Sequence, residues 1–329
     1  MHFADRLEQA IKNKGNPICV GLDPRFEKLP IELQKDAILK YGLTAKAMAE
    51  AFIAFNKAIL DAVAELVPVC KPQAAFYEEL GWEGLRAYEA TIAYAKEKEL
   101  LVISDAKRGD IGSTAQAYAR AHLARVRGTP PQSVLEFEET LKSDGESIAG
   151  FDADALTVNP YLGRDTLEPF LQTAAANGRG VFVLVKTSNK GSGDLQDLPL
   201  AEKNAPLYEH VAGMVHELGQ SCRGQCGLSA VGAVVGATYP KQARRLRELM
   251  PDAIFLIPGY GAQGGSAEDA AAGFLSGGRG AIVNSSRGII FAYQQKPYDK
   301  KYGENDFAGA ARAAVLKMAE ELKAVLNAK

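Results

Sequence analysis

Short apolar runs alternate with amphipathic segments along nearly the whole chain. Runs rich in Val, Ile, Leu and Ala predict eight strands, at Ile18–Gly21, a segment ending at Lys71, Leu101–Ile103, 154–161, 180–189, 229–238, 253–261 and 279–289. Apolar residues at steps of three and four predict helices at Phe3–Lys14, 44–66, Trp82–Lys98, from Thr114 to about Arg125, 164–177, 203–219, 240–250, 266–276 and 306–327. This alternation predicts an α/β fold, a (β/α)8 (TIM) barrel with a parallel eight-stranded core, rather than an open doubly wound sheet.

The segment 44–66 has the clearest helical pattern. Phe52, Phe55 and Ile59 recur on one face, and Thr44 stands where a helix N-cap is expected. We expect this helix to pack on the sheet.

Polar side chains gather just after the predicted strands. In barrels of this class the loops at the carboxyl ends of the strands build the active site, so these residues are expected on one face. The loops that precede the strands show only ordinary surface residues and turns. The residues that follow the strands are Asp23, Lys71, Asp105, Lys107, Asn159, Lys186, Ser188, Thr238, Gln263 and Arg287.

The stretch DAKRGDIGST, at 105–114, carries the densest charge at a strand end. Side chains alternate along a strand, so Asp105 and Lys107 are expected on the same side. Asp110 follows across Gly109, where the chain can turn and carry this second carboxylate elsewhere. A charge run at a strand end is usually a solvated surface, but a solvated run needs neither this spacing nor a strand to present it.

Two loops near the C-terminus have the composition of a phosphate site. PGYGAQGGS leads into a helix at about Ser266, and NSSRGI places Arg287 before Gly288. Glycines let backbone N–H groups approach an anion, and an arginine fork suits phosphate oxygens. Either loop could be a plain turn, but the pair at strands seven and eight of a barrel favours phosphate.

Composition restricts the class of protein. The chain has 329 residues, 47% of them hydrophobic, and a formal net charge of −2. These values predict a globular protein with one large barrel domain, and the absence of a polybasic patch argues against nucleic acid as a partner. No signal peptide or long apolar span opens the chain, so we expect a cytoplasmic protein without a membrane partner.

Two features have no role in this interpretation. The pattern dissolves between 128 and 150, which we interpret as an insertion with local helix at Leu135–Leu141. Cys222 and Cys226 form C-x3-C, but no second Cys or His cluster lies near, so they are expected to be incidental thiols rather than metal ligands.

The residue types limit the chemistry. All four histidines lie off the strand ends, so we expect neither a histidine base nor a histidine-rich metal site, and we assign no metal ligands. A lysine beside a carboxylate stays protonated, and a protonated lysine is a poor Schiff-base nucleophile but a good proton donor. Lys107 is therefore the candidate proton donor.

DAKRGDIGST resembles the Asp-x-Lys-x-x-Asp signature of the orotidine 5′-phosphate decarboxylases, in particular their longer bacterial, type 2 branch. PGYGAQGG resembles the phosphate loop of that family, and the matches extend over nearly the whole chain. The resemblance implies that orotidine 5′-phosphate loses CO2 to give uridine 5′-phosphate (UMP) in pyrimidine biosynthesis, without metal or organic cofactor, and that Lys107 protonates the C6 carbanion.

The same resemblance implies roles for the other residues. Asp105 would lie near the departing carboxylate, and Lys71 would complete a charged array with it. Asp23 would hold the ribose hydroxyls, Ser188 would read the base, and Gln263 and Arg287 would bind the phosphate under a lid formed by KTSNKGSGDLQDLPL. Asp110 and Thr114 would enter the site of a partner subunit, which implies a homodimer. The remaining candidate substrate-binding residues are Asn159, Lys186 and Gly288.

Two other functions remain open from the residues. A sugar-phosphate decarboxylase or aldolase could share D-x-K-x-x-D, but we would expect an extra acidic metal ligand near the strand ends, and VCKPQ has lysine at one such place. A non-catalytic phosphate-binding barrel is the other alternative, and the intact set of Asp105, Lys107 and Asp110 argues against it.

Overall fold

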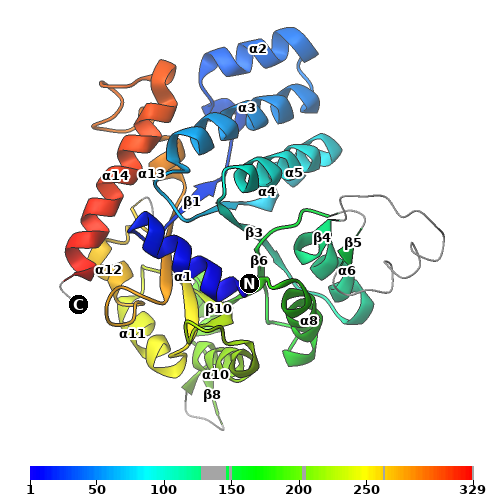
Figure 1. Ribbon diagram of the computed structural model, residues 1–329, viewed down its shortest axis with the longest axis vertical. Coiled ribbons are helices and arrows are strands. Elements are labelled where there is room, and N and C mark those ends of the chain that lie inside the picture. The colour runs from blue at the N-terminus through cyan, green and yellow to red at the C-terminus, as the bar shows by residue number, and fades with distance from the viewer. Residues whose placement is uncertain (127–145, 148–149, 202–204, 262–263, 328–329) are drawn as a thin grey trace. The chain divides into compact units, whose positions relative to one another are not determined.

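The computed structural model describes residues 1–126, 146–147, 150–201, 205–261 and 264–327 (Figure 1). Within these ranges, eight strands close a barrel in the order β1-β12-β11-β10-β7-β6-β3-β2. They are β1 (Ile18–Leu22), β2 (Val69–Pro72), β3 (Leu101–Arg108), β6 (Ala155–Val158), β7 (Gly180–Lys186), β10 (Ser229–Val235), β11 (Ala253–Ile257) and β12 (Ala281–Ser285). The predicted parallel (β/α)8 barrel is confirmed, and each predicted strand contains or overlaps one of these.

The predicted helices are also present, with bounds that shift by a few residues at most ends. They are α1 (Phe3–Lys14), α3 (Ala45–Val63), α5 (Gly81–Glu97), α6 (Gly112–Leu123), α8 (Glu168–Asn177), α10 (Leu207–Gly219), α11 (Pro240–Leu249), α12 (Ala267–Ala271) and α14 (Phe307–Leu326). α12 is much shorter than predicted. The expected helix at Leu135–Leu141, with most of the expected insertion, lies outside the described residues.

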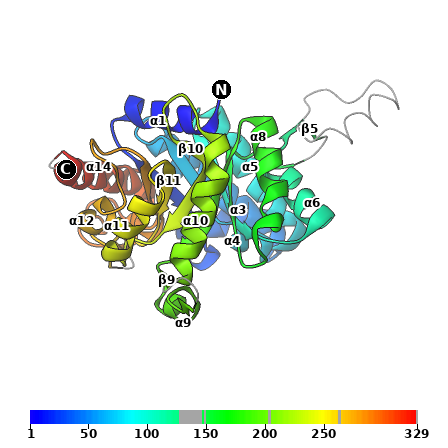
Figure 2. The same ribbon diagram turned by 90° about the horizontal axis from the view of Figure 1, so that it is seen from below.

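Several smaller elements were not predicted. They are α2 (Ile31–Tyr41), α4 (Ala74–Glu78), α9 (Gly193–Gln196), α13 (Arg287–Ile290), the 3-10 turns η1 (Phe26–Lys28), η2 (Arg164–Thr166), η3 (Lys190–Ser192), η4 (Gln220–Cys222), η5 (Ala292–Gln294) and η6 (Glu304–Asp306), and the short strand pairs β4 (Arg125–Val126) with β5 (Glu146–Ser147) and β8 (Pro199–Leu200) with β9 (Ala205–Pro206). Figure 2 shows α9 and β9 where α10 begins.

The chain divides into two compact units. The first contains Met1–Gln9, Lys107–Val283 and Val325–Lys329, and the second contains Ala10–Ala106 and Asn284–Ala324. The prediction of one domain stays a prediction. No helix in the described part of the chain is both long and apolar enough to cross a membrane.

The second unit has an aromatic core around α3. The ring of Phe55 stacks on Phe291 and Phe307, with centroids 5.8 and 5.2 Å away. Thr44 caps α3 as predicted, because its hydroxyl accepts a hydrogen bond from the backbone N–H of Ala47 at 3.2 Å. α2, α3 and α5 lie in succession in this unit (Figure 1). α2 escaped prediction because Ala37 is its one buried residue among those described, so it lacks an apolar stripe.

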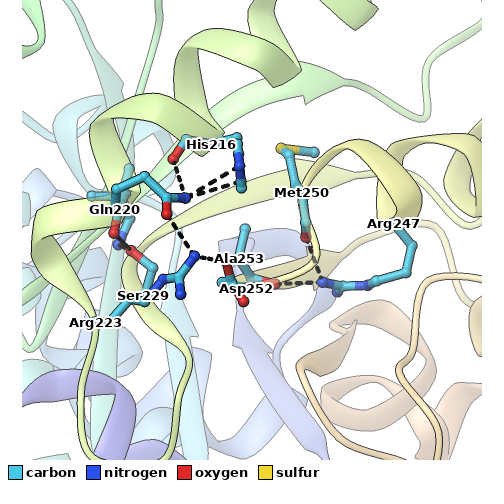
Figure 3. Close-up of polar contacts among 10 residues, drawn as sticks. His216, Gln220, Arg223, Ser229, Arg247, Met250, Asp252 and Ala253 are labelled. Atoms are coloured by element: carbon cyan, nitrogen blue, oxygen red, sulfur yellow. Dashed lines mark hydrogen bonds and ion pairs between the residues drawn. The ribbon is translucent and has the colours of Figure 1, made fainter.

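The first unit contains a buried arginine, Arg247 on α11, near the amino ends of two of its strands. Arg247 on α11 donates hydrogen bonds to four backbone carbonyls, and its guanidinium lies 3.6 Å from the centre of the Phe255 ring. Burial lowers the pKa of Arg247 to about 9, so the group stays charged at neutral pH. The four acceptors belong to Gly273, Met250, Ala253 and Gly280, two of them labelled in Figure 3.

Candidate active site

A buried ion pair joins the carboxyl ends of β2 and β3. The Nζ of Lys71 lies 2.5 Å from Oδ2 of Asp105, and the two side chains are only 5% and 8% exposed. The amide of Gln73 donates to the same oxygen at 3.0 Å. Burial alone would lower the pKa of Lys71, but the negative charges of Asp105 and Asp23 outweigh it and raise the pKa overall. Lys71 is therefore an ammonium that fixes the Asp105 carboxylate.

Asp23 follows β1 and has an acceptor without a donor. Its Oδ1 is buried and has no hydrogen-bond partner among the described residues, and the same holds for Oδ1 of Asn284 and Oγ of Ser286 at the end of β12. Gly21 lets these segments approach, since a Cβ there would lie 2.6 Å from the Cβ of Ser286. Buried polar atoms normally have partners, so this group is suited to a ligand that brings hydroxyl or N–H donors.

Cys19 lies beside this charged group but is not a nucleophile. Its side chain is fully buried, and burial, with the nearby charges of Asp105 and Asp23, raises the pKa of the thiol to about 12 although Lys71 opposes the shift. The thiol is therefore neutral at physiological pH, and thiolate chemistry is not available here.

Lys107 departs from the expected strand geometry. Its φ is +48°, in the left-handed region that β-strands do not use, and the expected placement of Asp105 and Lys107 on the same side stays a prediction. The backbone N–H of Lys107 donates to the side-chain hydroxyl of Thr157, with 2.9 Å between N and Oγ1, which fixes this conformation. Asp105 is buried and Lys107 is exposed. A non-glycine residue in this region costs about 1–3 kcal/mol and is typical of functional sites.

Asp110 and Asn159 lie in neighbouring loops of the first unit. Oδ1 of Asp110 accepts from the N–H of Ile111 at 2.8 Å, and the N–H of Asn159 donates to the carbonyl of Arg108 at 2.8 Å. Gly109 permits this approach, because a Cβ there would lie 3.0 Å from the Asn159 carbonyl. Asp110 is half-buried, while Asn159 is exposed, as is Thr114 in the first turn of α6.

Apolar side chains are exposed on the same loops and on α6. Ile111 is 62% exposed, Tyr161 72% and Leu162 50%. Tyr118, on α6, is also exposed and lies under the guanidinium of Arg108, 5.3 Å from its ring centre. Large apolar side chains grouped on a surface are typical of a protein interface.

Lys186, at the end of β7, is completely buried. Its Nζ lies 2.8 Å from Oδ1 of Asp197 and 3.2 Å from Oγ of Ser192. Ser188, two residues on, is half-buried, and Thr238 donates to its carbonyl at 3.2 Å. The ammonium of Lys186 is therefore paired with side chains of the protein itself. Its role as a direct substrate ligand stays a prediction.

The loop after β11 folds back on itself. The N–H of Gly261 donates to the carbonyl of Gly265 at 2.8 Å, and the N–H of Gly265 donates to the carbonyl of Gly259 at 3.0 Å. Ser266 and Asp269 form a capping box at the start of α12. The capping box already satisfies donors at this helix terminus, so a phosphate here would need loop amides and not the helix end. Gln263 lies outside the described residues.

Arg287 and Gly288 begin α13, directly after β12. Arg287 is exposed, and its carbonyl accepts from Nε2 of Gln295 at 2.8 Å. Gly288 lies beside Ser285, whose Oγ would be 3.1 Å from a Cβ at this position. These two residues belong to the second unit, with Asp23, Lys71 and Asp105.

No group of three or more His, Cys, Asp or Glu side chains with the arrangement of a metal site occurs in the part of the chain that is described. His122 is buried in α6, where burial and the charge of Arg108 lower its pKa to about 3. Cys222 and Cys226 are free thiols.

Some residues of this region were not found from the sequence. Gln73, which holds Asp105, follows Lys71 and Pro72 without any distinctive pattern. Asn284, with its unpartnered oxygen, lies within an apolar strand. Asp197 stands three positions after Asp194 in the same segment, and its contact with Lys186 distinguishes it.

The family follows from comparison with known proteins. Residues 16–300 match the family model described as orotidine 5′-phosphate decarboxylase / HUMPS family. The chain belongs to this family. A protein of Rhodopirellula baltica named orotidine 5′-phosphate decarboxylase is 46% identical over 323 residues, which cover 98% of this chain and 99% of that one. One of Petrotoga mobilis with the same name is 41% identical and covers 97% of each chain.

Solved structures of the family share the fold. The structure of Leishmania donovani OMP decarboxylase superimposes with a TM-score of 0.68 at 31% sequence identity and covers 100% of both chains. The resemblance inferred from DAKRGDIGST is therefore confirmed, and the relatives named above match over essentially the full length of the chain.

Proposed function

We propose that this member of the family decarboxylates orotidine 5′-phosphate to UMP, a carbon–carbon lyase reaction of pyrimidine biosynthesis. One observation carries the proposal: Asp105, held 2.5 Å from Lys71 in a buried ion pair, comes two positions before the exposed Lys107 with its positive φ on β3. The proposal is supported by the name shared by relatives that are 46% and 41% identical over nearly the full chain.

In the proposed reaction the bond between C6 and the carboxyl carbon breaks. The electron pair stays on C6, CO2 departs, and Lys107 transfers a proton from its ammonium to C6. An ammonium about 4 Å from a full negative charge gains about 4 kcal/mol at an effective dielectric constant near 20. Asp105, held rigidly by Lys71, lies near the departing carboxylate and disfavours its charged ground state.

The ribose and base would be held by residues at the strand ends. We assign the ribose hydroxyls to Asp23, because its buried Oδ1 lacks a donor among the described residues. Ser188 contacts the base from the end of β7, and Asn159 contributes from the end of β6. Hydroxyl donors from the substrate would complete the hydrogen bonding of Asp23.

The phosphate would be bound by Arg287, Gly288 and Gln263. Arg287 is exposed after β12 and offers a planar fork to phosphate oxygens. Because Ser266 and Asp269 cap α12, the backbone donors come from the glycine-rich loop. Binding energy from the phosphate, remote from C6, holds the reacting carbon in place.

We further propose a homodimer in which Asp110 and Thr114 enter the partner's site. The exposed side chains of Ile111, Tyr161 and Leu162 support this, since they lie on the same loops as Asp110 and Asn159. Neither a metal nor an organic cofactor takes part in the proposed reaction.

An ultraviolet assay of orotidine 5′-phosphate consumption tests the activity. We expect turnover that persists unchanged after treatment with a chelator. Absence of turnover by a folded protein would overturn the proposed function, and loss with the chelator would indicate a metal-dependent reaction instead.

Mixing two inactive variants tests the shared site. Lys107→Ala and Asp110→Ala homodimers should each be nearly inactive, yet subunit exchange gives heterodimers in which one site keeps both residues. About half of the dimers would be heterodimers with one intact site, so up to roughly a quarter of the parental activity should return. If exchange is demonstrated by mass spectrometry and no activity returns, Asp110 serves its own subunit.

A further inference from the structure

Lys186 is a fully buried charge just before Ser188. Burying an ammonium costs several kcal/mol unless it is paired and hydrogen-bonded. An apolar side chain would fill the same space without that cost, so packing alone does not explain a lysine here. The explanation must come from the groups that its Nζ contacts.

Those groups come from one short segment, Asn189–Leu198, which contains η3 and α9. Asp197 accepts from Nζ of Lys186 at 2.8 Å and Ser192 accepts at 3.2 Å. The ammonium also lies 4.5 Å from the centre of the Tyr239 ring, which follows β10. Lys186 has no exposure, whereas Asp197 is 43% exposed, so the carboxylate reaches inward from the surface to the lysine.

Further hydrogen bonds fasten the same segment around Ser188. The side chain of Gln196 accepts from the N–H of Thr187 at 3.0 Å and donates to its hydroxyl at 2.8 Å. The hydroxyl of Tyr239 donates to the carbonyl of Asn189 at 3.2 Å. All of these contacts lie within the first unit.

We propose that Lys186 is a positioning residue, which latches the segment Asn189–Leu198 and thereby fixes Ser188 for recognition of the substrate's base. This proposal rests on the proposed function. When the segment lies against β7, Lys186 has a carboxylate and a hydroxyl as partners. When the segment lifts away, both partners leave, and the ammonium depends on water entering the core. The charge therefore couples the position of the segment to the end of β7, which an apolar side chain could not do.

A measurement without substrate tests the latch directly. In Lys186→Met and Asp197→Ala, hydrogen exchange of residues 187–198 should be at least tenfold faster than in the parent. Lys190→Met and Asp194→Ala are the matched controls, because these exposed residues lie on the same segment and have no ion pair with any described residue. Unchanged exchange in Asp197→Ala, which alters a half-exposed side chain, would overturn the proposal even if Lys186→Met fails to fold.

Kinetics with orotidine 5′-phosphate test the consequence. Both latch variants should raise KM at least tenfold and change kcat less than threefold, and the double variant should be no worse than the more affected single variant. The proposal would be overturned if KM is unchanged in the single variants. It would also be overturned if the effects of the two substitutions on KM are fully additive in the double variant. If the parent itself shows no turnover, the proposed function fails, while the exchange measurement still decides whether the latch exists.

Discussion

Arg247 and the Lys71–Asp105 pair are both buried charges in the barrel, but their hydrogen bonding differs. Arg247 lies at the amino ends of strands, and four backbone carbonyls accept from it. The pair lies at the carboxyl ends, where the nearby Asp23 keeps an acceptor without a donor among the described residues. A buried charge whose acceptors are backbone carbonyls outside the candidate site, as for Arg247, is expected to serve stability. A charged group with acceptors left over is prepared for a ligand, and the variants below separate these two cases.

The largest effect is expected for Lys107. Lys107→Ala removes the proposed proton donor, so kcat should fall by about a thousandfold or more, within the range that general acid catalysis and charge stabilisation together supply. Because Lys107 is exposed, the protein should stay folded. Single-turnover kinetics and circular dichroism check the two parts, and turnover within tenfold of the parent would remove Lys107 from the mechanism.

Lys107→Gly sharpens the same test. Glycine adopts positive φ without strain, so this variant should be about 1 kcal/mol more stable than Lys107→Ala in urea unfolding, although equally inactive. Glu99→Gly is the matched control, because Glu99 is exposed with a φ of +61° and has no proposed role. It should gain similar stability and keep full activity. Equal stability of the two Lys107 variants would show that no strain is stored there.

Arg287 should have the next largest effect, on substrate binding. Arg287→Ala removes an exposed fork proposed to hold the phosphate, so KM should rise by about a hundredfold, equal to about 2.7 kcal/mol, and kcat/KM should fall. Added guanidinium should restore part of the loss. An unchanged KM would show that Arg287 and the glycine-rich loop do not form the anion site.

Arg247 should affect stability and leave catalysis unchanged. Arg247→Met removes one donor from each of four buried carbonyls, of which those of Met250 and Gly280 keep a backbone donor, so the free energy of unfolding should fall by about 3 kcal/mol, measured in urea. Arg244→Met, an exposed arginine on the same helix, should change it by less than about 0.5 kcal/mol. A KM raised in Arg247→Met at a temperature where it is fully folded would contradict the distinction between the two regions.

The barrel could be predicted from the sequence because its strands are buried runs of apolar residues separated by helices of ordinary length. Thr44 could be identified as the N-cap of α3 because a helix cap is recognised from the residues directly beside it in the sequence. The Ser266–Asp269 capping box is also a local sequence signal. Its spacing could have indicated that these two side chains accept hydrogen bonds from backbone N–H groups at the start of α12.

The details of the site could not be predicted, because they depend on tertiary contacts. The positive φ of Lys107 accompanies a hydrogen bond to Thr157, fifty residues away, and strand alternation gives no sign of it. The burial of Lys186 depends on Asp197, eleven residues away. The carbonyls around Arg247 come from loops before two different strands, so no motif marks that arginine.

The left-handed backbone at Lys107 has a consequence for laboratory evolution. At this position thermostability favours glycine, while the proposed chemistry requires lysine. A library screened only for heat resistance should therefore accumulate the substitution Lys107→Gly and yield durable, inactive proteins. A screen based on pyrimidine prototrophy should retain lysine and find its stabilising changes elsewhere, for example at Glu99, where φ is also positive and the side chain has no proposed role.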